Sequence, residues 1–119
     1  MKLDWITLGV SDLEKSLSFY RDLLNLEISA RFGDENQRIV FLGEAGGTKI
    51  ELIFKPNAKV ENPGNGVSIG LEADDLDGLV GLLNDKGFKT TGPISPNPRL
   101  RFFFVRDPDG YTIQLVEQK

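Results

Sequence analysis

Two arginines and two hydrogen-bonding side chains recur at one constant spacing in this chain. Arg38 and Arg101 lie 63 residues apart, and the same distance separates Glu51 from Gln114. An arginine can bind a carboxylate or a phosphate through two parallel hydrogen bonds. A carboxylate such as Glu51 can accept a hydrogen bond from a ligand, or take a proton from it as a general base. These residue types are suited to recognising a small molecule or to moving a proton on one.

Two missing residue types limit the chemistry further. The chain has no histidine and no cysteine. Histidine is the commonest general base and metal ligand near neutral pH, so catalytic triads and histidine-bearing metal sites are excluded. The lack of cysteine excludes disulfides and thiolate metal sites, and it fits a cytoplasmic protein. Any reaction must use carboxylates, Lys, Tyr, Arg or an added cofactor.

Composition narrows the classes of partner. The chain has 119 residues, 39% of them hydrophobic and 27% charged, with a net charge of -4. This is ordinary for a globular protein, and the negative charge without a basic cluster argues against nucleic acid as a partner. No apolar run approaches the roughly 20 residues that a membrane span needs. A small molecule is the partner that this composition leaves open.

The 63-residue spacing extends through most of the chain as an internal repeat. Ile6 matches Ile69, Phe41 matches Phe104 and Gly47 matches Gly110, without a gap anywhere in the register. A repeat of this kind predicts two copies of one structural unit. We place the copies at residues 1–55 and 67–119, joined by a linker at 56–66 that is rich in Pro, Gly and Asn.

Each copy is predicted to be a βαβββ unit, with one helix packed on a four-stranded sheet. A capping box from Ser11 to Glu14 predicts a helix that starts at Asp12, and Asp74 is the predicted cap of the second helix. Residues 92–98, with three prolines, are predicted to be a loop. The predicted strands are residues 2–10, 26–32, 37–42, 49–54, 67–73, 88–91, 99–106 and 111–117.

Alternation along these strands separates a helix-facing side from an open side. We assign Ile39, Phe41, Phe102 and Phe104 to the helix side. Two such half-sheets placed side by side would curve into an open eight-stranded mixed sheet around a concave cleft, which is the expected binding site. The side chains predicted to face this cleft are those of Trp5, Thr7, Arg38, Val40, Glu51, Ile53, Ser68, Arg101, Phe103, Gln114 and Val116.

Two sequence motifs carry a resemblance to a known family. These are the run DLEKSLSFYRDLL at 12–24 and the run DPDGYTIQL at 107–115, within the tandem repeat. Together they resemble the vicinal oxygen chelate superfamily, which includes glyoxalase I, fosfomycin-resistance enzymes, extradiol dioxygenases and bleomycin-resistance proteins. The resemblance covers essentially the whole chain and implies the α+β fold described above. It says little about activity, because one fold hosts many functions.

The resemblance also implies where a metal would be held. Enzymes of the family place its ligands on the first and last strands of each module, and the matching positions here are Trp5, Glu51, Ser68 and Gln114. A single carboxylate does not meet the needs of zinc, nickel or iron(II), which require two or three converging donors. We therefore predict no metal and no other cofactor.

The leading functional hypothesis is metal-independent binding of a small aromatic or anionic molecule, as in bleomycin-resistance-like members of the family. An antibiotic or secondary metabolite is the ligand that the resemblance implies. Trp5 and Phe103 would supply aromatic walls. Thr7, Arg38, Glu51, Ser68, Arg101 and Gln114 would supply the polar contacts.

Two alternatives stay open at this point. In the first, Glu51 is the general base of a glyoxalase-like lyase or isomerase, with or without a divalent metal. Without the metal, Arg38 or Arg101 would have to stabilise the negative oxygen. In the second, the chain is a vestigial or regulatory module whose pocket Trp5 closes. Arg38 and Arg101 also have a structural reading as ion-pair partners of nearby acids. A homodimer is expected for any of these functions, because the family's cavity often forms across a dimer and exposed sheet edges favour pairing.

Overall fold

The computed structural model describes all 119 residues, which form two compact units, Met1–Glu61 and Asn62–Lys119. The division falls inside the segment predicted as the linker, residues 56–66. No helix in either unit combines the length and the hydropathy that crossing a bilayer would require. The assembly of both units into one domain stays a prediction.

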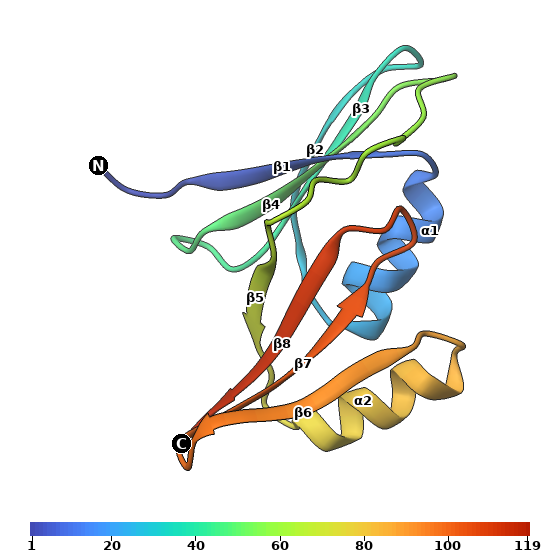
Figure 1. The fold of residues 1–119 in the computed structure, drawn as a ribbon. Coiled ribbons are helices and arrows are strands. Elements are labelled where there is room, and N and C mark those ends of the chain that lie inside the picture. Colours follow the sequence, from blue (N-terminus) through green and yellow to red (C-terminus); the bar gives the residue numbers. More distant parts are fainter. The chain divides into compact units, whose positions relative to one another are not determined.

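Unit 1 is a four-stranded mixed sheet with one helical segment packed on it (Figure 1). Its strands run in the order β1-β4-β3-β2, with β1 parallel to β4 and the other neighbours antiparallel. The elements are β1 (Trp5–Val10), α1 (Leu13–Leu17), the π-helical turn η1 (Ser18–Leu23), β2 (Ile28–Gly33), β3 (Arg38–Leu42) and β4 (Lys49–Phe54).

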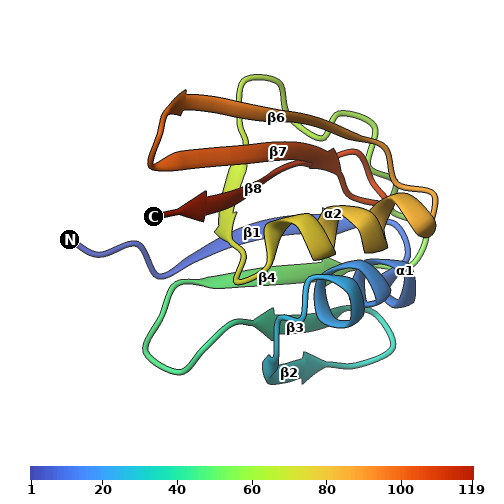
Figure 2. The same cartoon turned by 90° about the horizontal axis from the view of Figure 1, so that it is seen from below.

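Unit 2 repeats this topology with the strand order β5-β8-β7-β6, in which β5 is parallel to β8. Figure 2 shows β6, β7 and β8 side by side. Helix α2 contacts β6 and β8. The elements are β5 (Ile69–Glu72), α2 (Leu76–Asp85), β6 (Thr90–Asn97), β7 (Leu100–Arg106) and β8 (Thr112–Gln118). The predicted α+β class and the tandem βαβββ modules are confirmed.

The strand registers of the two units match residue by residue. Trp5 pairs with Lys49 in unit 1, and Ile69 pairs with Ile113 at the same separation in unit 2. The antiparallel pair Phe41 and Glu51 has its counterpart in Phe104 and Gln114. The 63-residue repeat in the sequence is therefore also a repeat of backbone hydrogen bonding.

The core of each unit lies between the helix and the sheet. Leu17, Tyr20, Leu76 and Leu83 each have none of their surface exposed. Leu17 and Tyr20 are three residues apart and Leu76 and Leu83 are seven apart, spacings that keep each pair on one face of its helical segment. The strand residues buried with them include Leu8, Val10, Val40, Leu42, Ile50, Leu52, Phe103, Val105, Ile113 and Leu115.

Both helices start one residue later than predicted. The carboxylate of Asp12 accepts a hydrogen bond from the backbone N–H of Lys15 at 3.1 Å, so Asp12, not Ser11, is the N-cap. In unit 2, Asp75 accepts from the N–H of Gly78 at 3.1 Å, and the predicted cap Asp74 lies before it. Asp12 and Asp75 are 63 residues apart and occupy the same position in the repeat. The repeat could therefore have identified both N-caps, which the separate capping motifs did not.

The predicted loop at 92–98 is wrong, because β6 runs from Thr90 to Asn97 through Pro93 and Pro96. Proline cannot donate a ladder hydrogen bond, but an edge strand leaves one side unpaired and tolerates it. β6 is the edge of its sheet, and its pairing with β7 shifts register on both sides of Ile94.

Candidate functional site

The strand pairing determines which side chains share the open face of each sheet. Phe41 lies directly opposite Glu51, and Val40 lies opposite Leu52. Opposed residues project to the same side of a sheet. Phe41 therefore lies on the open side with Glu51, whereas Val40 is buried against the helix and only 2% exposed. The predicted faces of β3 are thus reversed.

The same reversal occurs in unit 2. Phe104 pairs with Gln114 and Phe102 pairs with Val116, so both aromatic rings lie on the open side. Phe103, predicted to line the cleft, is 8% exposed and belongs to the core.

Both errors have one physical cause. Residues 39–42 and 102–105 are continuous apolar runs, so alternation does not define their faces, and a one-residue shift in register exchanges the faces completely.

Three aromatic rings form a row on the open face of unit 1. Trp5 and Phe41 meet edge to face with their ring centroids 5.5 Å apart, and Phe32 meets Phe41 in the same way at 6.0 Å. Trp5 and Phe32 keep 51% and 60% of their surface exposed. Large exposed aromatic side chains that pack on one another leave ring surface free for a planar ligand.

Glu51 lies next to this aromatic row. The hydroxyl of Thr7 donates a hydrogen bond to Glu51 Oε1 at 2.5 Å across the parallel pair of β1 and β4. The three predicted site residues of unit 1 that share the open face are therefore Trp5, Thr7 and Glu51. The carboxylate has a second oxygen with which to accept a hydrogen bond from a ligand.

The open face of unit 2 carries smaller side chains at the matching positions. Gly70 pairs with Gln114 where unit 1 has Thr7 and Glu51, and exposed Ser68 precedes β5 where unit 1 has Trp5. A Cβ atom on Gly70 would lie 3.8 Å from Gln114 Oε1, an ordinary contact distance. Phe104 lies directly opposite Gln114, and its ring centroid is 5.5 Å from that of Phe102. At these matching positions unit 2 has no charged side chain and is less filled than unit 1.

The two predicted arginines do not lie on the open faces. Arg38 lines a pocket of about 440 Å³ together with Leu13 and Glu14 of the helix side. Arg101 donates to both oxygens of Asp77 on α2, at 2.9 and 3.0 Å, and to Glu117 at 3.1 Å. Of the two readings of Arg101, its contacts match the structural one, an ion-pair partner of nearby acids.

The contacts of Arg101 shift the acid–base equilibrium of this cluster. The hydrogen bonds from Arg101 lower the pKa of Asp77, and the Coulomb attraction of the same guanidinium adds to that effect. In return, Asp77 first and then Glu117 raise the pKa of Arg101 above its already high ordinary value. A guanidinium that already faces two carboxylates has little attraction left for an anionic ligand.

The side chains at the family's metal positions do not fit a metal. An indole has no lone pair available for coordination, and Trp5 packs against Phe41. Glu51 is the one carboxylate at the four positions, and one of its oxygens already accepts the Thr7 hydroxyl. Ser68 and Gln114 offer neutral oxygens, which are poor donors for zinc, nickel or iron(II). No group of three or more Asp and Glu side chains comes together elsewhere in the chain.

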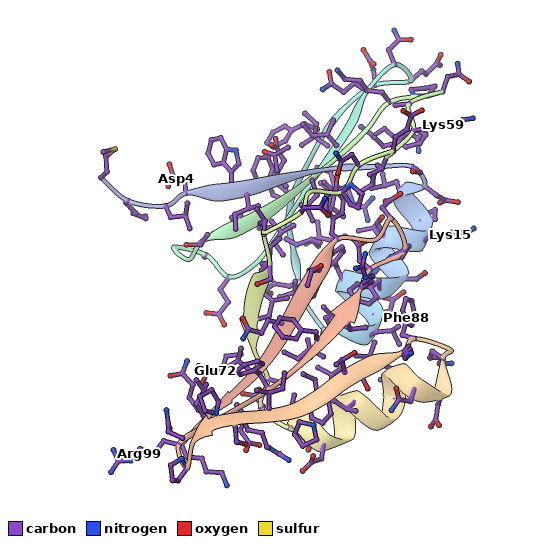
Figure 3. The ribbon with its side chains drawn as sticks, viewed as in Figure 1. Asp4, Lys15, Lys59, Glu72, Phe88 and Arg99 are labelled. Atoms are coloured by element: carbon purple, nitrogen blue, oxygen red, sulfur yellow. The ribbon has the colours of Figure 1, made fainter.

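A small pocket adjoins the open face of unit 1. Its volume is about 250 Å³, and Thr7, Gly9 and Ile53 contribute to its wall. Lys55 and Lys59, from the segment that follows β4, also line it. In Figure 3, Lys59 lies at the far end of unit 1 from Asp4, which precedes β1.

Sequence reasoning missed Phe32, Phe41 and the two lysines of this pocket. The pairing of β3 with β4 could have identified Phe41. Either register places Phe41 opposite Glu51 or opposite a core residue, and the first of these puts it on the open face. No comparable signal marked the lysines, since they lie in the predicted linker.

Comparison with known proteins agrees with the geometry. A sequence profile of the Glyoxalase/Bleomycin resistance protein/Dioxygenase superfamily matches residues 2–115. The chain belongs to this superfamily. Its relatives include the probable lactoylglutathione lyase of Synechocystis, 32% identical over 117 residues that span 91% of this chain and 88% of that protein. The lactoylglutathione lyase of Haemophilus influenzae is 29% identical over 121 residues, 94% of this chain and 89% of that protein.

Solved structures of the superfamily share the fold. Glyoxalase I of Leishmania major superposes with a TM-score of 0.84 at 23% identity, over 98% of this chain and 86% of that one. An antibiotic binding protein from a Streptomyces species superposes with a TM-score of 0.74 at 24% identity, over 100% of this chain and 97% of that one. One glyoxalase fold thus serves both catalysis and ligand binding among its known members.

Proposed function

We propose that this protein binds a small planar aromatic molecule, such as an antibiotic or secondary metabolite, without a metal. The observation that carries the proposal is the row of Trp5, Phe41 and Phe32 on the open face of unit 1. Aromatic walls with a few polar groups are typical of small-molecule sites. The antibiotic binding protein of Streptomyces, which shares the fold, supports this choice of ligand class.

The polar groups beside the aromatic row limit which ligands fit. Glu51 favours a ligand with an N–H or O–H donor, or a positive charge above the rings. The expectation of an anionic ligand relied on Arg38 and Arg101, and both lie on the helix side. An anionic substituent would instead find Lys55 and Lys59 at the small pocket.

A thermal-shift screen with planar aromatic antibiotics and aromatic amines tests this proposal. A ligand present at about 100 times its dissociation constant adds roughly 2.7 kcal/mol to the free energy of unfolding, which shifts the melting temperature visibly. Trp5 is the only tryptophan, so its fluorescence reports on binding at this face directly.

Three variants sharpen the test. We expect Trp5→Leu to abolish the shift and Glu51→Gln to weaken binding of amines more than that of neutral rings. Leu82→Ala, which truncates an exposed side chain of α2, is the control and should bind normally. Equal binding by all three variants would refute the site.

A second candidate function is that of a lyase acting on lactoylglutathione. The names of relatives that are 28% to 32% identical favour it. Glu51 would be the general base for proton abstraction. Arg38 and Arg101 would have to stabilise the developing negative oxygen, but neither shares the open face with Glu51. Without a metal, several kcal/mol of charge stabilisation would also be lacking.

Interconversion of lactoylglutathione and its cleavage products, assayed by chromatography in both directions, tests the second candidate. If turnover occurs and Glu51→Gln abolishes it, the protein is an enzyme and the binding proposal is replaced. If no turnover is detected and no ligand is found, the hypothesis of a vestigial or regulatory module becomes the better one.

We also propose that the protein is a homodimer. The edge strands β2 and β6 each have one unpaired side, and Phe32 on β2 is 60% exposed. Unpaired edges with exposed apolar side chains favour association with a second chain. Light scattering coupled to gel filtration should give twice the chain mass of 13.2 kDa.

A further inference from the structure

Unit 2 contains the largest of the described pockets, and none of the predicted site residues lines it. The pocket has a volume of about 680 Å³, within the range of about 300–1,000 Å³ typical of ligand sites. It lies at the end of the sheet where β6 and β8 begin and β7 ends. Its walls combine two aromatic rings, two hydroxyls and two cations: Phe88, Phe104, Thr91, Thr112, Lys89 and Arg106.

The strand register places the polar groups of this pocket beside one another. Arg106 pairs with Thr112 across β7 and β8, and Thr91 pairs with Phe104 across β6 and β7. Since Phe104 and Arg106 are two residues apart on one strand, both project to the open side. An arginine, a hydroxyl and an aromatic ring therefore share one end of the open face.

The two cations of the pocket are available to a ligand. Neither Lys89 nor Arg106 takes part in an ion pair, in contrast to Arg101 with its two carboxylates. The one acidic residue in the lining is Asp107, which is 5% exposed. Its Oδ1 atom accepts the backbone N–H groups of Asp109 and Tyr111, both at 2.9 Å, so backbone dipoles already compensate its charge.

We propose that this pocket is a second binding site, specific for a planar aromatic carboxylate. Arg106 would bind the carboxylate through two hydrogen bonds, with the Thr112 hydroxyl beside it. Lys89 would add a second positive charge, and the rings of Phe88 and Phe104 would contact the aromatic part of the ligand. The inference is independent of the site proposed on unit 1, because it depends on residues of unit 2 alone.

Isothermal titration of the full chain with 2-naphthoate tests this site. We expect saturable binding to the unaltered protein, a loss of at least about tenfold in Arg106→Gln and a smaller loss in Lys89→Gln, as the removal of one charge-assisted pair predicts. Arg99→Gln is the matched control, since it removes the same charge at the opposite end of β6 from Phe88 (Figure 3). It should bind as tightly as the unaltered protein.

Several outcomes would overturn the proposal. The site is refuted if 2-naphthoate does not bind, or if Arg106→Gln and Arg99→Gln weaken binding equally. Equal binding of neutral 2-naphthalenemethanol would refute the role of the cations, and equal binding of inorganic phosphate would refute the role of the rings. Loss of binding in Trp5→Leu with no effect of Arg106→Gln would assign the ligand to unit 1 instead, which keeps this proposal separable from the proposed function.

Discussion

At the scale of single residues, Ser16 stands out because its hydroxyl is buried without a partner. Its side-chain oxygen is fully buried in α1 and forms no hydrogen bond. A buried hydroxyl left unpaired costs about 1–3 kcal/mol, and alanine favours a helix slightly more than serine does. We expect Ser16→Ala to raise the free energy of unfolding by about 1 kcal/mol in urea titrations. The exposed neighbour Ser18→Ala should change it little, and a destabilised Ser16→Ala would show that the hydroxyl has a partner.

A second residue-scale prediction concerns Asp77 and the pH dependence of stability. Because Arg101 lowers the pKa of folded Asp77, the folded state binds a proton at this carboxyl less readily than the unfolded chain does. The pair therefore stabilises the fold above the unfolded pKa near about 4, and the stabilisation is lost as the pH falls through the lower folded value.

Melting curves of Asp77→Asn across pH test this prediction. The variant should melt below the unaltered protein at about pH 6, and the difference should vanish near about pH 2. Asp74→Asn removes the same charge outside the pair and should show no such pH dependence. A difference for Asp77→Asn that grows toward acid pH would contradict the assignment.

At the scale of elements, each helix depends on one aspartate at its start. Asp12 and Asp75 each accept a backbone N–H that has no partner within the helix. We expect Asp12→Ala and Asp75→Ala each to cost about 1 kcal/mol of unfolding free energy, and Asp75→Asn to cost little. Asp74→Ala is the control, because Asp74 is not the cap. Equal losses for Asp74→Ala and Asp75→Ala would refute the capping role.

The strands show how far the sequence could define the fold and where it could not. The 63-residue repeat and the helix-capping residues predicted both βαβββ units, and the bounds of β4 match the prediction. The faces of β3 and β7 could not be derived, since residues 39–42 and 102–105 are apolar at every position. The preference of aromatic side chains for burial then predicted that Phe41 and Phe104 face the helix. The cross-strand register places both on the open face.

That error also explains which site residues were found. Trp5, Thr7 and Glu51 lie on β1 and β4, where alternation is clear, and the structure brings them together. Arg38, Arg101 and Phe103 lie on the two ambiguous strands, and all three are on the opposite face. Arg106 was missed because its repeat partner is Gly43, so the repeat did not mark it.

At the scale of the whole molecule, the two units have kept one backbone plan while their open faces have diverged. Unit 1 presents Trp5, Thr7 and Glu51, where unit 2 presents Ser68, Gly70 and Gln114. The four metal positions of the family contain a single carboxylate as a result. Under the proposed function, these side chains would hold a ligand without polarising it through a metal.

The most direct test of this account is a ligand titration followed by Trp5 fluorescence, before and after treatment with EDTA. An aromatic ligand from the thermal-shift screen should give the same dissociation constant in both states, and added Zn²⁺, Ni²⁺, Mn²⁺ or Fe²⁺ should leave it unchanged. Loss of binding in EDTA that these metals restore would contradict metal-independent binding and make a metalloenzyme the better description.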